Sequence, residues 1–321
     1  MKNRSVIFVI TLFFYCVTYS VNFFEYCIVD TSRKELYPHA TSHPYRTCMM
    51  HVWIPNPSIH FCKAKYPLIL FSHGLGGTYN GMTYTNLCNN IASHGYVVAS
   101  VSHTYACKPI QFPDGTQSPY LFPSRAVHFQ SNKHMFDIET DMWVADMICA
   151  LDECARYNVC KDNPLYDAID MSRVGIIGHS LGGSTALQVC RTDDRVEIAV
   201  NLDGPLYGTG CHMPFNKPIL CIFGSSVLPG QITSLGTVPH HAVFFWRHCF
   251  NMMWLPALQK FIASSLQIET VIIDGVIHDT FSDYAFTPDP AIQKWLLDGA
   301  AGQEMICKYV CDFLDRYFLH S

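Results

Sequence analysis

A serine near the middle of the chain carries the pattern of an activated nucleophile. The sequence reads Gly178-His179-Ser180-Leu181-Gly182 at the end of an apolar run, and a helix-forming stretch follows at once. Glycines two residues before and two residues after the serine permit the sharp strand-to-helix turn that presents a hydroxyl above a sheet. A tight packing turn without chemistry is the alternative, and the surrounding strand and helix disfavour it. We predict that Ser180 is the nucleophile of an acyl transfer.

A histidine must accept the proton of this serine, because a serine hydroxyl is a weak nucleophile at neutral pH. In folds with this turn the chain order is serine, acid, histidine. The chain has 16 histidines, of which His278 follows the last predicted strand, residues 269–273. That position lies at the carboxyl end of the sheet, where Ser180 also lies. We therefore predict His278 as the base.

The acid that orients the base is expected to be Asp203. Residues 218–268 contain no Asp or Glu, so the acid must precede them. Asp203 directly follows the strand predicted at residues 197–202. Three competing carboxylates fit a solvated helix end or a turn better, and they are Asp193, Asp194 and Asp274.

Two backbone amides are expected to hold the developing oxyanion. One belongs to Leu181, which follows the nucleophile at a helix N-terminus. The second donor should come from the loop after the strand at residues 67–72, which reads His73-Gly74-Leu75-Gly76. We predict Leu75 as this second donor, since glycines on both sides allow close approach to the substrate.

Strand and helix signals alternate through the chain and predict an α/β fold. Short apolar runs are typical of strands buried on both faces, and the intervening helices then cover both faces of a mostly parallel sheet. The predicted strands are residues 47–54, 67–72, 96–101, 173–177, 197–202, 218–223 and 269–273, and the predicted helices are 84–94, 134–157 and 184–190. Residues 104–133 form a long excursion.

Composition favours one large core. The 321 residues are 49% hydrophobic and 15% charged, and no linker or repeat divides residues 21–321, so we predict a single domain. The net charge of −5 gives no support for nucleic-acid binding.

The N-terminus predicts export. Residues 1–20 hold two basic residues, a twelve-residue apolar run and small residues near a cleavage point, which is typical of a signal peptide. Cleavage would leave 19 basic and 26 acidic residues and a net charge of −7. An uncleaved anchor stays possible, since Val21, Phe23 and Phe24 extend the apolar run. We expect a secreted or envelope-exposed protein.

Fourteen of the 15 cysteines lie outside the predicted signal peptide, an even number that fits an oxidising compartment. Cys149, Cys190 and Cys221 fall in predicted core elements and are expected to be buried thiols. Better candidates for disulfides are Cys48, Cys62, Cys88, Cys107, Cys154, Cys160, Cys211, Cys249, Cys307 and Cys311. No His/Cys cluster has metal-ligand spacing, so we predict neither a metal nor a cofactor.

The sequence resembles the platelet-activating factor acetylhydrolase family, the plasma and type II enzymes of the α/β-hydrolase superfamily. The segments that carry the resemblance span residues 66–286 in order. They are residues 71–76 (FSHGLG), 91–99 (IASHGYVVA), 174–183 (VGIIGHSLGG), 202–203 (LD) and 278 with 281–283 (H, FSD), after a lead-in at 30–33 and 53–55.

The resemblance implies an α/β-hydrolase fold and the triad Ser180, Asp203 and His278, with Leu75 and Leu181 as oxyanion donors. It implies calcium-independent hydrolysis of short or oxidised acyl chains on phospholipids, as in a 1-alkyl-2-acetylglycerophosphocholine esterase. Contact with a membrane or lipoprotein surface would follow. This chain departs from the family after Asp203 and in an apparent insertion around residues 225–262, and both segments help to wall the acyl pocket.

Alternatives remain open. A cutinase, polyester hydrolase or triacylglycerol lipase would share the turn and the triad, and a non-catalytic binding module would share the fold. Within the insertion, residues 244–254 are rich in aromatic residues and methionine. They fit an apolar lid or lipid-facing surface and a packed core helix equally well.

Overall fold

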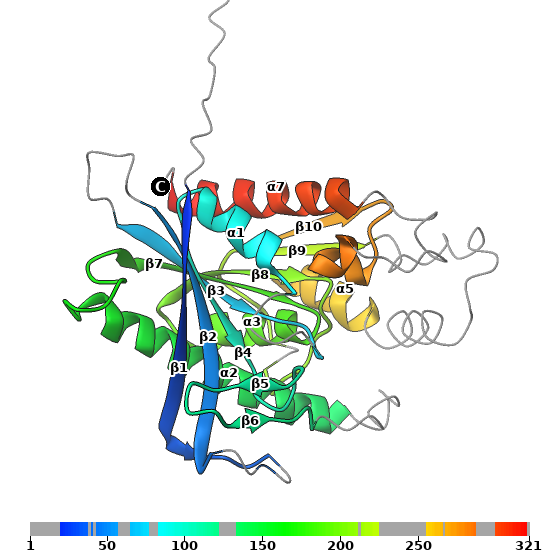
Figure 1. The fold of residues 1–321 in the computed structure, drawn as a ribbon. Helices are drawn as coiled ribbons and strands as arrows, with labels where there is room; N and C mark the ends of the chain where they lie inside the picture. The colour runs from blue at the N-terminus through cyan, green and yellow to red at the C-terminus, as the bar shows by residue number, and fades with distance from the viewer. Residues whose placement is uncertain are drawn as a thin grey trace, which may run out of the picture.

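An eight-stranded sheet crosses the molecule and carries the strand ends at which the predicted site lies (Figure 1). This computed structural model describes residues 20–37, 40, 43–56, 65–76, 83–121, 133–210, 213–224, 255–265, 267–286 and 299–319. The strand order is β1-β2-β4-β3-β7-β8-β9-β10. The strands are β1 (Val21–Lys34), β2 (Tyr45–Pro55), β3 (Tyr66–Ser72), β4 (Val97–Ser102), β7 (Ile169–His179), β8 (Val196–Leu202), β9 (Ile219–Gly224) and β10 (Ile268–Ile273).

The sheet is mostly parallel, as the sequence predicts. Neighbouring strands from β4 to β10 all pair in parallel, whereas β2 pairs antiparallel with β4 and with β1. The central strands β3 and β4 are buried along their whole length, which explains why their sequences are continuous apolar runs. The parallel strands bring their carboxyl ends to one edge, and this edge holds the site.

The edge strand β1 was not predicted. Its 14 residues include Asp30, Arg33 and Lys34, and most of its side chains are exposed or half-buried. An edge strand has only one neighbour, here β2, and needs no continuous apolar run. Phe23 stacks on His51 and lies against Trp53 of β2. The apolar residues that follow the predicted signal peptide therefore belong to this strand.

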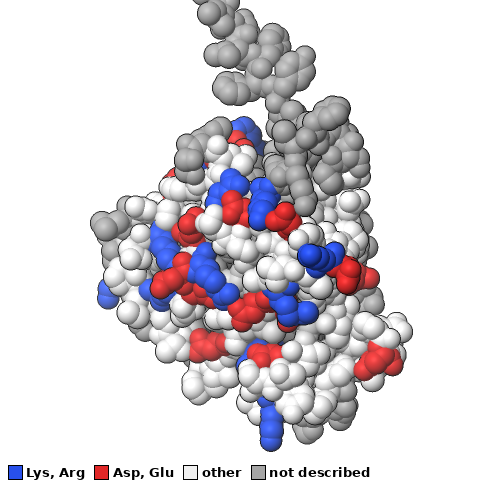
Figure 2. All heavy atoms as spheres, turned by 90° about the vertical axis from the view of Figure 1, so that its left-hand side faces the viewer, with Lys and Arg blue, Asp and Glu red and all other residues white. Residues whose placement is uncertain are grey.

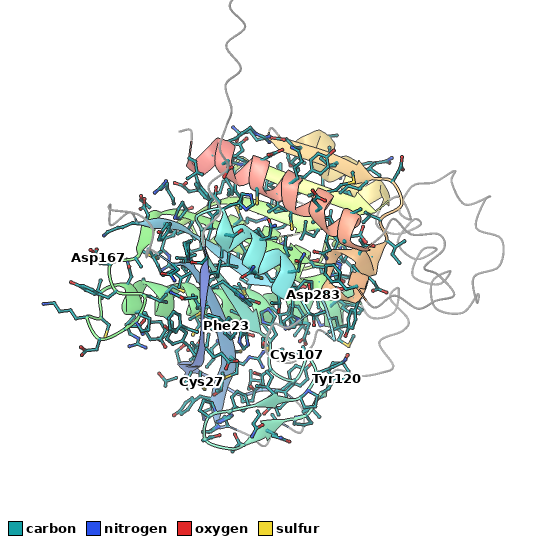
Figure 3. The ribbon with its side chains drawn as sticks, turned by 45° about the horizontal axis from the view of Figure 1, so that its top comes forward. Phe23, Cys27, Cys107, Tyr120, Asp167 and Asp283 are labelled. Carbon is teal, nitrogen blue, oxygen red and sulfur yellow. The ribbon has the colours of Figure 1, made fainter. Side chains whose placement is uncertain are left out.

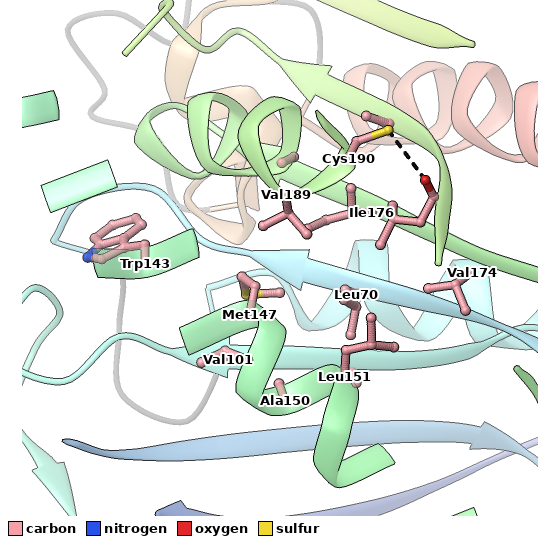
Figure 4. Close-up of a cluster of buried hydrophobic side chains, with 14 of the residues drawn as sticks. Leu70, Val101, Trp143, Met147, Ala150, Leu151, Val174, Ile176, Val189 and Cys190 are labelled. Atoms are coloured by element: carbon pink, nitrogen blue, oxygen red, sulfur yellow. Dashed lines mark hydrogen bonds between the residues drawn. The ribbon is translucent and has the colours of Figure 1, made fainter. Parts of the chain in front are cut away.

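Helices cover both faces of the sheet (Figure 1). α2 (Lys133–Asn158) and α3 (Leu181–Thr192) pack together on one face, and α1 (Thr85–Ser93) and α7 (Gly299–Phe318) pack on the other. Alternate residues of β3 serve the two faces, since Leu70 joins the first core cluster and Phe71 the second. In Figure 4, Trp143, Met147 and Leu151 of α2 belong to the same buried cluster as Leu70, Val101 and Val174 of the sheet.

Shorter elements complete the description. The excursion after β4 holds a small hairpin of β5 (Ile110–Gln111) and β6 (Gln117–Ser118). α5 (Leu255–Ser264) precedes β10, and the 3₁₀ turns η6 (His278–Phe281) and η7 (Asp283–Phe286) follow it. Residues 244–254 lie outside the described ranges, so the choice between lid and core stays a prediction. None of the helices in the described ranges is long and apolar enough to cross a bilayer.

The disulfide prediction is wrong where the structure describes its cysteines. Cys48, Cys88, Cys107, Cys154 and Cys307 are buried free thiols, and Cys160 is an exposed one. The Cys311 thiol donates to Asn90. Burial in core elements, rather than pairing, accounts for most of these cysteines. Cys190 and Cys221 are buried as predicted and Cys149 is half-buried, while Cys62, Cys211 and Cys249 lie outside the described residues.

Charges are interleaved on the face that carries the amino ends of the parallel strands. Figure 2 shows Lys and Arg side chains alternating there with Asp and Glu. Ion pairs account for this pattern, and they include Lys65–Asp167, Arg156–Glu153, Arg173–Asp170 and Arg195–Asp152. Figure 3 places Asp167 on the side of the molecule opposite Asp283, which lies near the site.

Candidate active site

Ser180 stands at the junction of β7 and α3, as the motif predicts. Its φ of 55° and ψ of −124° lie in a region that non-glycine residues rarely adopt. Such a conformation costs of order 1–3 kcal/mol and persists only where the surroundings enforce it. The half-buried side chain is thereby turned out of the strand and above the sheet.

The glycine two residues after Ser180 is required by close packing. A Cβ on Gly182 would lie 2.1 Å from the carbonyl oxygen of Ser72, at the end of β3. A Cβ on Gly178 would lie 1.9 Å from the carbonyl oxygen of Gly182. The first turn of α3 therefore rests directly on the ends of β3 and β7, which brings the loop after β3 next to Ser180.

The structure brings together the three side chains that the sequence singled out. His278 Nε2 lies 3.0 Å from Ser180 Oγ, and His278 Nδ1 lies 2.6 Å from Asp203 Oδ2. In the sequence, His278 is 98 positions from Ser180 and 75 positions from Asp203. With Asp203 ionised, Nδ1 carries the proton and donates it, which leaves Nε2 as the acceptor for the serine hydroxyl. This is the hydrogen-bond polarity that general-base activation of a serine needs.

Asp203 is held firmly at the end of β8. Its side chain is 3% exposed, and its Oδ1 accepts a hydrogen bond from the backbone N–H of Gly224 at 3.1 Å. Its own N–H donates to the carbonyl of Ile222 in the neighbouring strand. The competing acids lie elsewhere: Asp193 pairs with Arg195, and the side chains of Asp194 and Asp274 are exposed.

The carboxylate of Asp203 sets the proton affinity of His278. Desolvation opposes protonation of the imidazole, but the hydrogen bond and negative charge of Asp203, with the charge of Asp279, raise the pKa of His278 above its ordinary value. A base with a raised pKa is a stronger proton acceptor, and it is neutral only at a correspondingly higher pH.

The two predicted oxyanion donors border Ser180. Leu181 is the first residue of α3, where backbone amides have no partner within the helix. A Cβ on Gly74 would lie 3.2 Å from Ser180 Cβ, so the loop that carries Leu75 touches the serine. Within the described ranges neither Leu75 N–H nor Leu181 N–H has a hydrogen-bond acceptor. Two unpaired amides beside a nucleophile form a suitable cradle for an oxyanion.

Sequence reasoning missed the residues that support this loop. The N–H of Gly74 donates to the Tyr84 hydroxyl at 2.9 Å, and this hydroxyl donates to His179 Nδ1 at 2.8 Å. The His179 ring lies 4.5 Å from the ring of His278. The position of His179 next to Ser180 was a usable signal, whereas nothing in the sequence around Tyr84 pointed to this contact.

The turn that carries His278 is fixed from two further elements. Asp283 accepts hydrogen bonds from the first amides of α1, and Figure 3 shows it beside that helix. Gln303 of α7 donates to the carbonyls of Thr280 and Ser282. Among the described residues, no group of three or more His, Cys, Asp or Glu side chains is arranged to hold a metal ion.

Comparison with known proteins adds to this geometry. A family model described as platelet-activating factor acetylhydrolase, isoform II, matches residues 43–118 and 155–319. The platelet-activating factor acetylhydrolase of Cavia porcellus is 23% identical over 283 residues, which cover 79% of this chain and 58% of that protein. A probable 1-alkyl-2-acetylglycerophosphocholine esterase of Arthroderma benhamiae is 26% identical over 251 residues, covering 77% and 54%. The chain thus spans about half the length of the curated relatives it matches.

A solved structure supports the fold. A ferulic acid esterase from Streptomyces cinnamoneus superimposes with a TM-score of 0.69 over 92% of this chain and 89% of that chain, at 21% identity. At this identity the likeness concerns the fold, which is the α/β-hydrolase fold expected from the sequence.

Proposed function

Because the chain belongs to the platelet-activating factor acetylhydrolase isoform II family, we propose that it is a serine carboxylic-ester hydrolase acting on lipid-like esters. The observation that carries the proposal is the continuous hydrogen-bonded path from Ser180 Oγ through the His278 ring to Asp203. In this proposal Ser180 is the nucleophile, His278 the base and Asp203 the residue that orients it.

The first half of the reaction forms an acyl-enzyme. His278 Nε2 takes the hydroxyl proton as Ser180 Oγ attacks the ester carbonyl, and the carbonyl oxygen becomes an oxyanion. The amides of Leu75 and Leu181 donate to this oxyanion, and each such donor is worth about 10² to 10³ in turnover. The protonated His278 then gives its proton to the leaving alkoxide, which departs as an alcohol.

The second half releases the acid. Water takes the place of the alcohol, and neutral His278 removes its proton as it attacks the acyl carbonyl. The same two amides hold the second oxyanion. When this intermediate collapses, the proton on His278 returns to Ser180 Oγ and the free acid leaves. Asp203 stays ionised throughout and stabilises the imidazolium that forms in each half.

For the substrate, we propose a short acyl ester of a glycerophosphocholine, cleaved without calcium. The support is the family and the name of the Arthroderma relative. Wild-type turnover of 1-alkyl-2-acetylglycerophosphocholine should exceed that of tributyrin and of an aliphatic polyester film, and EDTA should leave the rate unchanged. Cleavage of the polyester alone would contradict the phospholipid assignment. Higher activity on vesicles than on monomeric substrate would support contact with a lipid surface.

The catalytic assignment is tested at Ser180. Ser180→Ala should lower turnover of p-nitrophenyl butyrate by about 10⁶ and abolish the stoichiometric burst. Ser172→Ala, at the exposed far end of the same strand, is the matched control and should keep the burst. A burst in the Ser180 variant, or no burst in the wild type, would contradict the proposal and favour a non-catalytic binding module.

We also propose that the protein is exported. The support is the basic and apolar pattern of residues 1–20. N-terminal sequencing of the protein purified from its native source should find a mature chain that begins near Val21.

A further inference from the structure

A second Ser-His-Asp arrangement lies behind the loop that follows β3. Ser72 Oγ lies 2.9 Å from His103 Nε2, and His103 Nδ1 lies 3.0 Å from Asp146 Oδ2. The three residues come from the end of β3, from the residue after β4 and from α2. All three are at most 1% exposed, so no ester can reach this serine. We call this group the buried array.

The proton positions in the buried array follow from its partners. Asp146 accepts hydrogen bonds from Arg46 Nη2 at 2.7 Å and from Arg33 Nη2 at 2.8 Å. Burial opposes its ionisation, but the charge of Arg46 and the hydrogen bonds from His103 and Arg46 keep the pKa of Asp146 well below its ordinary value. Burial lowers the pKa of His103, so this ring is neutral. His103 Nδ1–H therefore donates to Asp146, and its Nε2 accepts from Ser72.

The buried array extends to the oxyanion loop through His73. The backbone N–H of His103 donates to His73 Nε2 at 3.0 Å, and His73 Nδ1 donates to the carbonyl oxygen of Gly74 at 2.7 Å. Burial lowers the pKa of His73 to about 3, so this ring too is neutral with a defined tautomer. The Trp143 ring stacks on His103 and meets His73 edge-on. The ring of His73 is thereby held in one orientation.

The orientation of His73 bears on the Leu75 amide through peptide geometry. In a trans peptide the C=O of one residue and the N–H of the next point in opposite directions. A bond that holds the Gly74 carbonyl on the side of His73 therefore directs the Leu75 N–H to the other side. Glycine has no Cβ to restrict its rotation, so Gly74 needs such restraint more than another residue would. The Tyr84 hydroxyl, which accepts from Gly74 N–H, restrains the preceding peptide.

We propose that His73, fixed by the buried array, and Tyr84 are positioning residues that hold the two peptides of Gly74 so that the Leu75 amide faces the oxyanion. The inference rests on the proposed ester hydrolysis. Neither side chain touches the substrate, since His73 is 1% and Tyr84 3% exposed. Their loss should therefore lower kcat and leave KM nearly unchanged.

Two substitutions of His73 separate its two hydrogen bonds. The amide nitrogen of Asn takes the place of Nδ1, so His73→Asn keeps a donor for the Gly74 carbonyl. The amide of Gln reaches the place of Nε2, so His73→Gln keeps an acceptor for His103 N–H and loses the bond to Gly74. With active sites titrated by a fluorophosphonate, His73→Gln should lose about 100-fold in kcat for p-nitrophenyl butyrate, the loss typical of one oxyanion donor. His73→Asn should stay within tenfold of the wild type.

A transition-state analogue gives a second measurement. A trifluoromethyl ketone forms an oxyanion on the nucleophile, so its affinity for His73→Gln should fall by the same factor as kcat.

Equal kcat values for His73→Gln and wild type, or equal losses of kcat in His73→Gln and His73→Asn, would overturn the positioning role. If His73→Gln does not fold, Tyr84→Phe takes its place and should lose at least tenfold in kcat at constant KM, and an unchanged kcat overturns the proposal. A wild type without esterase activity would instead contradict the proposed function.

Discussion

Ser180–His278–Asp203 and Ser72–His103–Asp146 use the same residue types with the same direction of hydrogen bonding. They differ in access. The side chain of His278 is 42% exposed, whereas His103 is completely buried. Ser180 has a strained backbone that lifts it out of its strand, while Ser72 continues the regular strand β3. The chemistry of a serine in such a group thus depends on where the backbone places it as well as on its partners.

The two carboxylates also differ in their partners. Asp203 receives one neutral backbone donor besides His278, so its charge acts on the histidine and raises the pKa of His278. Asp146 is compensated by Arg46 and Arg33, and burial keeps His103 neutral. The carboxylate of Asp203 thus outweighs desolvation and raises the pKa of His278, whereas burial outweighs the effect of Asp146 and lowers the pKa of His103.

Removing each carboxylate charge should separate a catalytic effect from a stability effect. Asp203→Asn should lower kcat by about 10⁴, because the amide favours the wrong tautomer of His278. Asp146→Asn removes the shorter of the two ion pairs of the buried Arg46, which keeps Glu35 at 3.3 Å, and should cost about 3 kcal/mol of unfolding free energy. Urea unfolding and steady-state kinetics on both variants measure the two effects.

Asp274→Asn is the matched control for these substitutions, since this exposed residue follows β10 directly and should change neither quantity. A larger kinetic loss at Asp274 than at Asp203 would reassign the orienting acid. A stable Asp146→Asn variant would remove the distinction between base and support.

The sequence singled out Ser180, His278 and Asp203, which the structure brings together, but it did not indicate the buried array. Ser180 has a local motif, and chain order with the absence of acids in residues 218–268 selects Asp203 and His278. No local pattern distinguishes Asp146 from the other charged residues of its 26-residue helix. Its role depends on hydrogen bonds from Arg46, which is 100 positions away in the sequence. β1 was not predicted for a related reason: an edge strand with exposed charged residues lacks the continuous apolar run by which the buried strands were predicted. Features with neither a local motif nor a rule of chain order were the ones that sequence patterns could not supply.

Glu139, which lies beside the buried array, should make the free energy of unfolding depend on pH. This carboxyl is 5% exposed and accepts from the Trp143 indole, whose ring stacks on His103. Burial raises the pKa of Glu139 to about 7. An acid whose pKa is raised by folding stabilises the fold below its unfolded pKa, and this contribution is lost as the pH rises through the folded pKa. The loss should amount to roughly 3 kcal/mol between about pH 4.5 and pH 7.

Glu139→Gln should therefore remove this pH dependence of stability, measured by urea unfolding at pH 5 and pH 8. Glu153→Gln on the same helix is the matched control, since Glu153 pairs with Arg156 near the surface and should leave the dependence in place. Identical pH dependence in the wild type and in Glu139→Gln would show that Glu139 titrates normally.

The smallest expected effect concerns the acid limb of activity. Hydrolysis needs neutral His278, so kcat/KM should rise with pH through a pKa above 6.5. The exposed carboxylate of Asp279 contributes to that raised pKa, and Asp279→Asn should move the acid limb to lower pH without changing the plateau. The shift should shrink in 1 M salt, because exposed charges are screened.

The pH dependence of stability at this pair is opposite in sign to that of activity. The stabilising effect of Asp203 on protonated His278 is present below pH 6.5 and is lost as the pH rises through the folded pKa. An acid limb that stays in place in Asp279→Asn at low salt would leave Asp203 as the source of the raised pKa of His278. It would sharpen the contrast with Asp146, whose influence on the pKa of His103 is outweighed mainly by burial.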